Sequence, residues 1–192
     1  MSLRKDKLIV VDLEATCWEG YTAPAGQRNE ILEIGVCLLD LETFAISNKR
    51  SLLITPTESV ISPFCTELTS ITHKMVETEG IPFADACAIL EKDYDSRNRM
   101  WSSWGAFDRD LFHKQCKRRN VRYPFNHKHA NLKRVYVDAT GERVGLHRAM
   151  RAFDVEFDGQ AHRGHDDAYN TAVLLSLILQ EQGLNLLRRR GL

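Results

Sequence analysis

The chain has 192 residues, of which 43% are hydrophobic and 27% are charged. These fractions are ordinary for a folded globular chain and exclude a collagen-like or low-complexity protein. The chain has 26 Lys and Arg residues and 26 Asp and Glu residues, which gives a net charge of +0. The net charge therefore does not indicate a polyanionic partner. A chain of this length buries enough surface to fold without disulfides or a structural metal, and we expect one domain over residues 1–192.

Three strands are expected in the first third of the chain. Residues 7–14, 30–42 and 44–56 carry the apolar runs and alternation that are typical of strands. Asp40–Thr43 suits a hairpin turn between the second and third of them. Because the connections are short, these strands are predicted to form an antiparallel meander.

From Pro63 onwards the apolar period changes, and helices are expected to alternate with short strands. The expected elements are a helix over 82–96, a strand over 100–105, a helix over 108–119, a short strand near 135–139, a helix from about Gly145 and a long final helix from about Asp166. A sheet flanked by helices is the layer architecture that this order favours.

The sequence also bears on where the protein works. Its longest apolar stretch, residues 172–179, is far shorter than the roughly 20 residues of a membrane-spanning helix, so no membrane partner is expected. The N-terminal segment lacks the core and cleavage site of a signal peptide. The five cysteines are odd in number, without a CxxC pair or a zinc-type cluster, which indicates a reducing compartment. We therefore predict a cytoplasmic protein.

Basic residues gather in four runs despite the zero net charge, at 116–122, 127–134, 142–151 and 188–190. Such runs could form a surface that follows nucleic-acid phosphates, and an ordinary solvated helix surface explains each of them equally well. The apolar LNLL at 184–187 could cover the sheet or join two subunits, so the sequence predicts no oligomeric state.

The first strand ends in two acids. Residues two apart on a strand point to the same face, so Asp12 and Glu14 are expected to project together while Leu13 points away. Two such carboxylates repel each other unless a cation lies between them, and Mg²⁺ suits carboxylate oxygens. A solvated strand end is the alternative, and one pair of acids taken alone favours it.

Another acid, Asp108, follows the strand at 100–105 and opens a helix. Aspartate is a favoured helix N-cap, yet the ends of strands are also where open α/β sheets collect their chemistry, so both interpretations stay open. Asp110 is expected only to complement the helix dipole. Trp101 and Trp104 are expected to share one face of the strand, in the core.

A third group, near the C-terminus, combines a histidine with acids. His162 and Asp167 are five residues apart, about 500° around a helix, so they would not share a helix face. We therefore expect His162 in a loop, Gly164 allowing the turn, and Asp167 in the first turns of the final helix. Histidine is the usual general base near neutral pH. Helix capping is the alternative, and Asp166 is expected to do only that.

Together, in this order, these residues resemble the DEDDh 3′-to-5′ exonuclease superfamily of the DnaQ type, over about residues 7–180. More specific motifs resemble the short exonuclease-domain proteins related to the enhanced-RNA-interference and histone-mRNA exonucleases. The matching motifs are DLEATCW at 12–18, EILEIG at 30–35, SPFCTELTSIT at 62–72, SWGAFDRD at 103–110, NLK at 131–133 and HRGHDDAYNTA at 162–172. The resemblance implies a ribonuclease-H-like fold, with a mixed central sheet flanked by helices.

The resemblance also implies a chemistry. Its site would hold two divalent ions, Mg²⁺ or Mn²⁺, on four acids, with His162 as the general base, and nucleoside 5′-monophosphates would leave from the 3′ end of the substrate. The implied metal-binding acids are Asp12, Glu14, Asp108 and Asp167. The expected substrate is single-stranded or 3′-overhanging nucleic acid. The subgroup motifs favour RNA, and DNA stays open because no contact to the 2′-hydroxyl can be identified. A catalytically silent interaction protein is a third alternative, which the intact set of five residues argues against.

Four further residues are candidates for contacts to the substrate. The backbone at Ala15 and Thr16, just past the first acids, could hold the terminal sugar. Phe64 and Leu68 could pack on the terminal base, because stacking on unpaired bases tolerates any sequence. The alternative, that Phe64 and Leu68 are core residues at helical spacing, carries equal weight.

Overall fold

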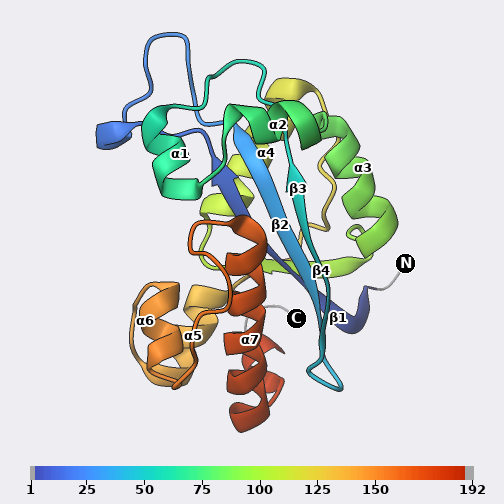
Figure 1. Ribbon diagram of the computed structural model, residues 1–192. Coiled ribbons are helices and arrows are strands. Elements are labelled where there is room, and N and C mark those ends of the chain that lie inside the picture. The colour runs from blue at the N-terminus through green and yellow to red at the C-terminus, as the bar shows by residue number, and fades with distance from the viewer. Residues whose placement is uncertain (1–2, 189–192) are drawn as a thin grey trace.

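A computed structural model describes residues 3–188 of the chain. Its five-stranded sheet has the order β3-β2-β1-β4-β5 (Figure 1). β2 is antiparallel to both β1 and β3, whereas β4 is parallel to β1 and β5 is parallel to β4. The strands are β1 Arg4–Ala15, β2 Ile31–Asp40, β3 Ile46–Leu53, β4 Arg99–Ser103 and β5 His129–Asn131. This antiparallel meander followed by parallel strands confirms the predicted sheet.

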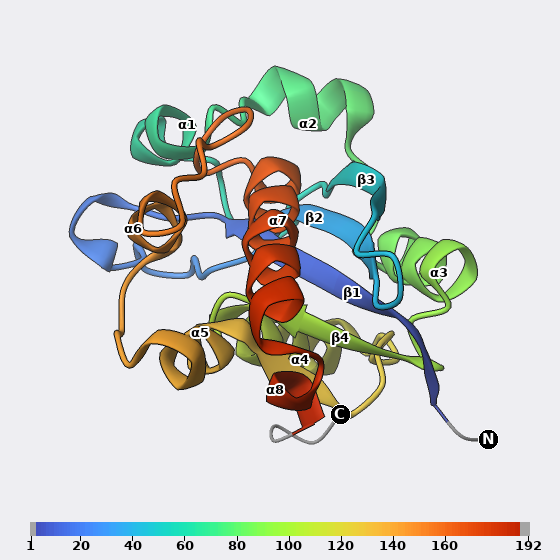
Figure 2. The ribbon, with the colours of Figure 1, turned by 90° about the horizontal axis from the view of Figure 1, so that it is seen from below.

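Helices cover both faces of the sheet. α7 crosses β1 and β2 on one face, with α5 and α8 beside it (Figures 1 and 2). α3 and α4 pack on the other face. The helices are α1 Pro63–Thr69, α2 His73–Glu79, α3 Phe83–Tyr94, α4 Phe107–Arg119, α5 Leu132–Thr140, α6 Leu146–Arg151, α7 Gly164–Gln182 and α8 Asn185–Arg188, with a 3-10 turn at Glu19–Tyr21.

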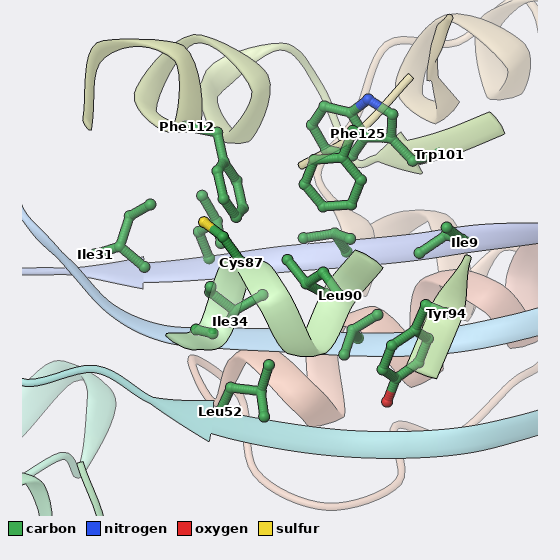
Figure 3. Packing of buried hydrophobic residues seen from close by; sticks show 14 of the residues in the cluster. Ile9, Ile31, Ile34, Leu52, Cys87, Leu90, Tyr94, Trp101, Phe112 and Phe125 are labelled. Atoms are coloured by element: carbon green, nitrogen blue, oxygen red, sulfur yellow. The ribbon is translucent and has the colours of Figure 1, made fainter. Parts of the chain in front are cut away.

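The central strand β1 feeds a hydrophobic core on each face of the sheet. Ile9 and Val11 point to the α3 and α4 side, where Phe112 lies over the strands (Figure 3). Leu8 and Val10 point to the α7 side. A strand that is covered on both faces needs apolar residues at consecutive positions, and this accounts for the unbroken run before Asp12.

Residues 135–139 are helical, so the prediction of a short strand there was wrong. They belong to α5, and the strand that joins the sheet is the preceding β5. Asn131 caps the helix, because its side chain accepts a hydrogen bond from the Arg134 amide at 3.2 Å. The helix buries three side chains at helical spacing, those of Leu132, Val135 and Tyr136. The β-branched and aromatic residues in this segment imitate a strand locally, and the cap and the tertiary packing override that preference.

Trp101 and Trp104 lie on opposite faces of the sheet, so the prediction that they share a face was also wrong. Trp101 is fully buried and stacks on Phe125, with ring centroids 4.3 Å apart. Trp104 packs on the α7 side against Tyr136, at 5.7 Å between centroids. Side chains three positions apart on an extended chain point in opposite directions, which explains the difference.

Several smaller expectations are resolved as well. Asp40 accepts hydrogen bonds from the amides of the next turn residues, which confirms the hairpin at Asp40–Thr43. Leu186 and Leu187 are buried in the α7-side core, so the LNLL segment covers the sheet. Residues 189–190 of the terminal arginine run lie outside the described part of the chain. None of the helices within residues 3–188 is long and apolar enough to cross a membrane.

Candidate active site

Three of the predicted acids meet where β1 ends and α7 begins. Asp12 and Glu14 come from β1, and Asp167 comes from the first turn of α7, which lies across that strand. One carboxylate oxygen from each residue lies within 4.8 Å of the other two. Residues some 150 positions apart in the chain thus form one acidic group. Sequence spacing alone could bring together only the first two.

The fourth predicted acid, Asp108, lies beside this group in a different role. It is the second residue of α4, whose N-cap is Ala106, so Asp108 does not cap the helix. Its buried carboxylate accepts a hydrogen bond from the Leu13 amide at 3.1 Å. Because Leu13 lies between Asp12 and Glu14, this bond fixes the segment of strand that carries both of them. Among residues 3–188, the cluster of mutually close ligand atoms contains the other three acids and not Asp108.

The start of α7 is held by a carboxylate that the sequence analysis did not single out. Glu33 of β2 is completely buried, and it accepts hydrogen bonds from Arg163 Nε and the Gly164 amide, both at 3.1 Å. His165 Nδ1 donates to its other oxygen at 2.6 Å. A Cβ on Gly35 would lie 1.8 Å from the Gly164 carbonyl carbon, so only glycine allows this backbone contact. The available signal was a single acid inside the apolar run of β2.

His162 lies in the turn before α7, as its spacing predicts. It is exposed, and its φ of 61° is in the left-handed region that few residues with side chains adopt. Its backbone faces the carboxylate of Asp167 and acts to lower the pKa of that acid, against the larger effect of burial. This contact places His162 at the edge of the acidic group.

Two other acids serve the surrounding structure. Asp166 accepts a hydrogen bond from the Gln160 amide at 2.8 Å and pairs with Lys49 at 2.6 Å, so it holds the turn that precedes α7. Asp110 is exposed and pairs with its neighbour Arg109. Neither belongs to the acidic group, as expected. The N-cap of α7 is Arg163, however, so the expectation that Asp166 caps this helix was wrong.

Burial and mutual repulsion together raise the proton affinity of the site acids. Burial, followed by the charges of Asp108 and Asp167, raises the pKa of Asp12 well above its usual range. The pKa of Glu14 is raised to about 8 and that of Asp167 to about 6, in both cases first by burial. The Oδ2 atom of Asp167 is buried with no hydrogen-bond partner in the described structure. Such acids suit a cation with oxygen ligands.

The two residues predicted to contact the terminal sugar, Ala15 and Thr16, differ in whether their polar groups are already hydrogen bonded. The Thr16 amide donates to the Glu30 carbonyl at 2.8 Å, and the Thr16 hydroxyl donates to the Arg28 carbonyl at 2.9 Å. The Thr16 carbonyl accepts from the Asn29 side chain at 2.6 Å. Thr16 therefore holds the following loop, and these bonds argue against a contact from its backbone to substrate. Ala15 is half-buried, at the end of β1.

The predicted base contacts, Phe64 and Leu68, are half-buried on α1. Neither belongs to the hydrophobic clusters of residues 3–188, whereas the neighbouring Cys65 does. Phe107, which precedes Asp108 and is 60% exposed, was not predicted as a contact residue from the sequence. An exposed phenylalanine next to a buried acid is a signal that only the structure reveals.

The chain matches the model of the exonuclease family RNase_T over residues 9–175. It is 29% identical to the 3′-5′ exonuclease Snipper of Drosophila melanogaster, in an alignment that covers 92% of this chain and 70% of that protein. It is also 29% identical to ERI1 exoribonuclease 2 of Homo sapiens, covering 88% of this chain and 28% of that protein. The chain therefore spans less than a third of the length of the human relative.

A solved structure has the same fold. The nuclease domain of 3′hExo, a DEDDh family member bound to rAMP, superposes with a TM-score of 0.84 at 25% identity, covering 95% of this chain and 96% of that domain. Exonuclease I of E. coli, in complex with a dA16 oligonucleotide, superposes with a TM-score of 0.74 at 14% identity, a likeness of fold alone. These matches confirm the predicted ribonuclease-H-like fold and the resemblance to DEDDh exonucleases.

Proposed function

The chain belongs to the exonuclease family, and on that premise we propose that it is a metal-dependent 3′-to-5′ exonuclease that converts single-stranded nucleic acid, RNA in preference to DNA, to nucleoside 5′-monophosphates. The observation that carries the proposal is the acidic group of Asp12, Glu14 and Asp167 within 4.8 Å, beside buried Asp108. The preference for RNA rests on similarity to relatives named exoribonucleases.

We propose that these acids hold two divalent ions, Mg²⁺ or Mn²⁺. Asp12, Glu14 and Asp167 would hold them, with the unpartnered Oδ2 of Asp167 as a ready ligand and Asp108 in support. When bound, such ions neutralise the charge of the scissile phosphate and lower the pKa of water. Asp108, through the Leu13 amide, holds the end of β1 in place, so that Asp12 and Glu14 stay aligned.

His162 would accept the proton of the attacking water. It is exposed at the rim of the acidic group, in the turn before α7, and its backbone faces the carboxylate of Asp167. We propose that the backbone of Ala15 contacts the terminal sugar and that Phe64 and Leu68 contact the terminal base. Exposed Phe107 is a further candidate for stacking. Thr16, whose amide and hydroxyl are already bonded, contributes indirectly through the loop it holds.

Two broader expectations remain proposals. We propose that residues 1–192 act as one exonuclease domain, since both hydrophobic cores share a single sheet. We also propose a cytoplasmic location, which five cysteines present as free thiols support.

The test is an exonuclease assay on 5′-labelled single-stranded RNA and DNA of matched sequence, in Mg²⁺, Mn²⁺ or EDTA. We expect a ladder that shortens from the 3′ end, needs metal, forms faster on RNA and is absent with Asp12→Asn. Equal rates on the two strands would refute the RNA preference alone. No ladder on either strand in either metal would refute the proposed activity.

A further inference from the structure

A groove of about 490 Å³ lies between the loop that joins β4 to α4 and the helix α5. Its walls include Trp104 and Ala106 from the loop and Lys133, Arg134 and Arg143 from α5 and the segment that follows it. The volume is within the range of sites that hold small ligands. Among residues 3–188, no acidic residue lines the groove.

We propose that this groove binds the backbone phosphates of the nucleotides upstream of the scissile bond. The proposal rests on the proposed exonuclease function and adds to it a second, non-catalytic binding site along the same strand. The ligand chemistry is the phosphodiester backbone, which RNA and DNA share.

The position of the groove supports this role. Ala106 of its wall is the N-cap of α4, and Asp108 is the second residue of that helix. The exposed Phe107 lies between them. The groove wall therefore ends only two residues before Asp108, so a strand whose 3′-terminal nucleotide reaches the acids would pass close to the groove.

The charges in the groove are available to a ligand. Lys133, Arg134 and Arg143 form no ion pair with any carboxylate among the described residues. In the basic run at 116–122, by contrast, Arg118 pairs with Glu58 at 3.0 Å. Basic runs with the same appearance in the sequence thus differ in the structure: the run at 116–122 is partly neutralised by ion pairs, whereas the runs at 127–134 and 142–151 present unpaired cations at the groove.

The NLK motif at 131–133 gains a physical role from this arrangement. Asn131 caps α5, Leu132 is buried beneath it, and Lys133 lines the groove. The first two residues fix the helix, so the third is presented at a defined place. A lysine on a fixed helix start loses less backbone freedom on binding a phosphate than one on a mobile loop.

The test compares Lys133→Ala/Arg143→Ala with the control Lys92→Ala/Arg122→Ala. Both double variants remove one lysine and one arginine, and neither control residue forms an ion pair in the described part of the chain. Lys92 lies on α3, on the other face of the sheet, and Arg122 follows the end of α4 that is distant from Asp108. The substrates are a single-stranded decanucleotide and the p-nitrophenyl ester of thymidine 5′-monophosphate, which lacks upstream nucleotides.

We expect the groove variant to raise KM for the decanucleotide roughly tenfold, as for the loss of charged hydrogen bonds, and to leave the ester unchanged. The salt dependence of log(kcat/KM) should weaken by about 0.7 for each phosphate contact removed from a single strand. The control should match the wild type. An equal change on both substrates, or an equal change in groove and control variants, would overturn the proposal.

A binding measurement separates this proposal from the function on which it rests. Fluorescence anisotropy of a labelled decanucleotide in EDTA reports the groove without hydrolysis. A wild-type protein that binds but cleaves nothing in Mg²⁺ or Mn²⁺ refutes the exonuclease, and weaker binding by the groove variant alone still supports the groove. Equal binding by all three proteins refutes the groove whatever the activity.

Discussion

The two ends of β1 treat their acids in opposite ways. At the amino end, Asp6 accepts two hydrogen bonds from Arg99, at 2.9 and 3.2 Å, and one from Arg4 at 2.8 Å. These partners, Arg99 first, lower the pKa of Asp6 below its usual range. At the carboxyl end, Asp12 and Glu14 face other acids, and their pKa values are raised. One strand therefore carries an acid that is paired with arginines at its amino end, and acids without a salt bridge among the described residues at its carboxyl end.

Buried acids outside the site follow the pattern of Asp6. Glu33 is held by His165, Arg163 and backbone, and these contacts outweigh its burial and lower its pKa to about 2. Glu30 pairs with Arg119. Glu33 and Glu30 thus have cationic partners, whereas no salt bridge to Asp12, Glu14 or Asp167 is found among the described residues. A net charge of +0 conceals this uneven distribution, which is the clearest physical mark of a cation site in the molecule.

The largest expected effect comes from removing a site acid. We expect Asp12→Asn to lower kcat by at least about 10⁴-fold, because the charge that holds the ions stabilises the transition state by several kcal/mol. The same variant should lose the Mg²⁺- or Mn²⁺-dependent rise in Tm that the wild type shows. Asp6→Asn, at the other end of the strand, is the matched control and should keep its kcat. Comparable losses of activity in both variants would refute the contrast between the two ends.

His162 tests whether the site contains more than metal-binding charge. We expect His162→Ala to lower kcat by about 10²–10⁴-fold, as for the loss of a general base, while the metal-dependent rise in Tm stays intact. The residue is exposed, so its removal should not unfold the protein. Single-turnover rates on labelled RNA provide the measurement. Wild-type turnover in this variant would exclude His162 as the base.

Phe64 lies near the acidic end of β1 but is uncharged. Its substitution therefore tests substrate binding without changing the charge of the site. The neighbouring Cys65 donates a weak hydrogen bond to the Ala15 carbonyl at 3.5 Å, which ties α1 to the end of the strand. We expect Phe64→Ala to raise KM for single strands about tenfold, as for the loss of one stacked base. Phe112→Ala, in the core, should instead cost about 3–5 kcal/mol of stability. A similar fall in Tm for both variants would favour a core role for Phe64.

Local rules predicted the parts of the site that depend on local geometry. Strand alternation placed Asp12 and Glu14 on one face, and helix geometry placed His162 in a loop before Asp167. That Asp167 reaches the other two was implied only by resemblance to a family. The physical cause is the close contact of α7 with β2 at Gly35, which no local pattern displays.

Other features depended on tertiary context and were missed for that reason. The partner of Glu33 lies 130 residues away in Arg163, so the acid looked like an interruption of a strand. The strand predicted at 135–139 failed because β-branched residues fit a buried helix face equally well. The exposure of Phe107 and the ion pairs of Arg118 distinguish a functional surface from a structural one only once the chain is folded.

Between pH 6.5 and 8, the pH dependence of stability should reflect the acids at the carboxyl end of β1. Glu14 has a pKa of about 8 in the folded protein against a usual value of 4.5, so the folded state binds more protons than the unfolded state between these values. Stability contributed by this proton is complete below pH 4.5 and is lost as pH rises towards 8. His129, with its pKa lowered to about 4 by burial, acts in the opposite direction but only below its usual value of 6.5.

Between pH 6.5 and 8, we therefore expect the Tm of the protein in EDTA to fall by several degrees. Saturating Mg²⁺ should reverse the slope, because ions compete with protons for the same oxygens. Glu14→Gln should flatten it in EDTA. Thermal unfolding by circular dichroism measures all three cases, and a flat profile for the wild type in EDTA would show that the acids are not held protonated.

The smallest effect is also the most direct comparison of the two ends. In EDTA at pH 7, Asp12→Asn removes repulsion from an acidic group that has no ion and should raise Tm. The side chain of Arg99 is only 8% exposed. Asp6→Asn leaves it with Asp95, at 3.9 Å, as its one carboxylate partner among the described residues, and should therefore lower Tm. Each change is expected to be about 1 kcal/mol, or roughly 2–4 °C for a chain of this size. The two substitutions are chemically identical and lie on one strand, so a shift in the same direction for both would show that their surroundings do not differ as the distances indicate. Opposite shifts, together with the loss of activity only in Asp12→Asn, would mean that the acidic end sacrifices stability for a function that the amino end does not share.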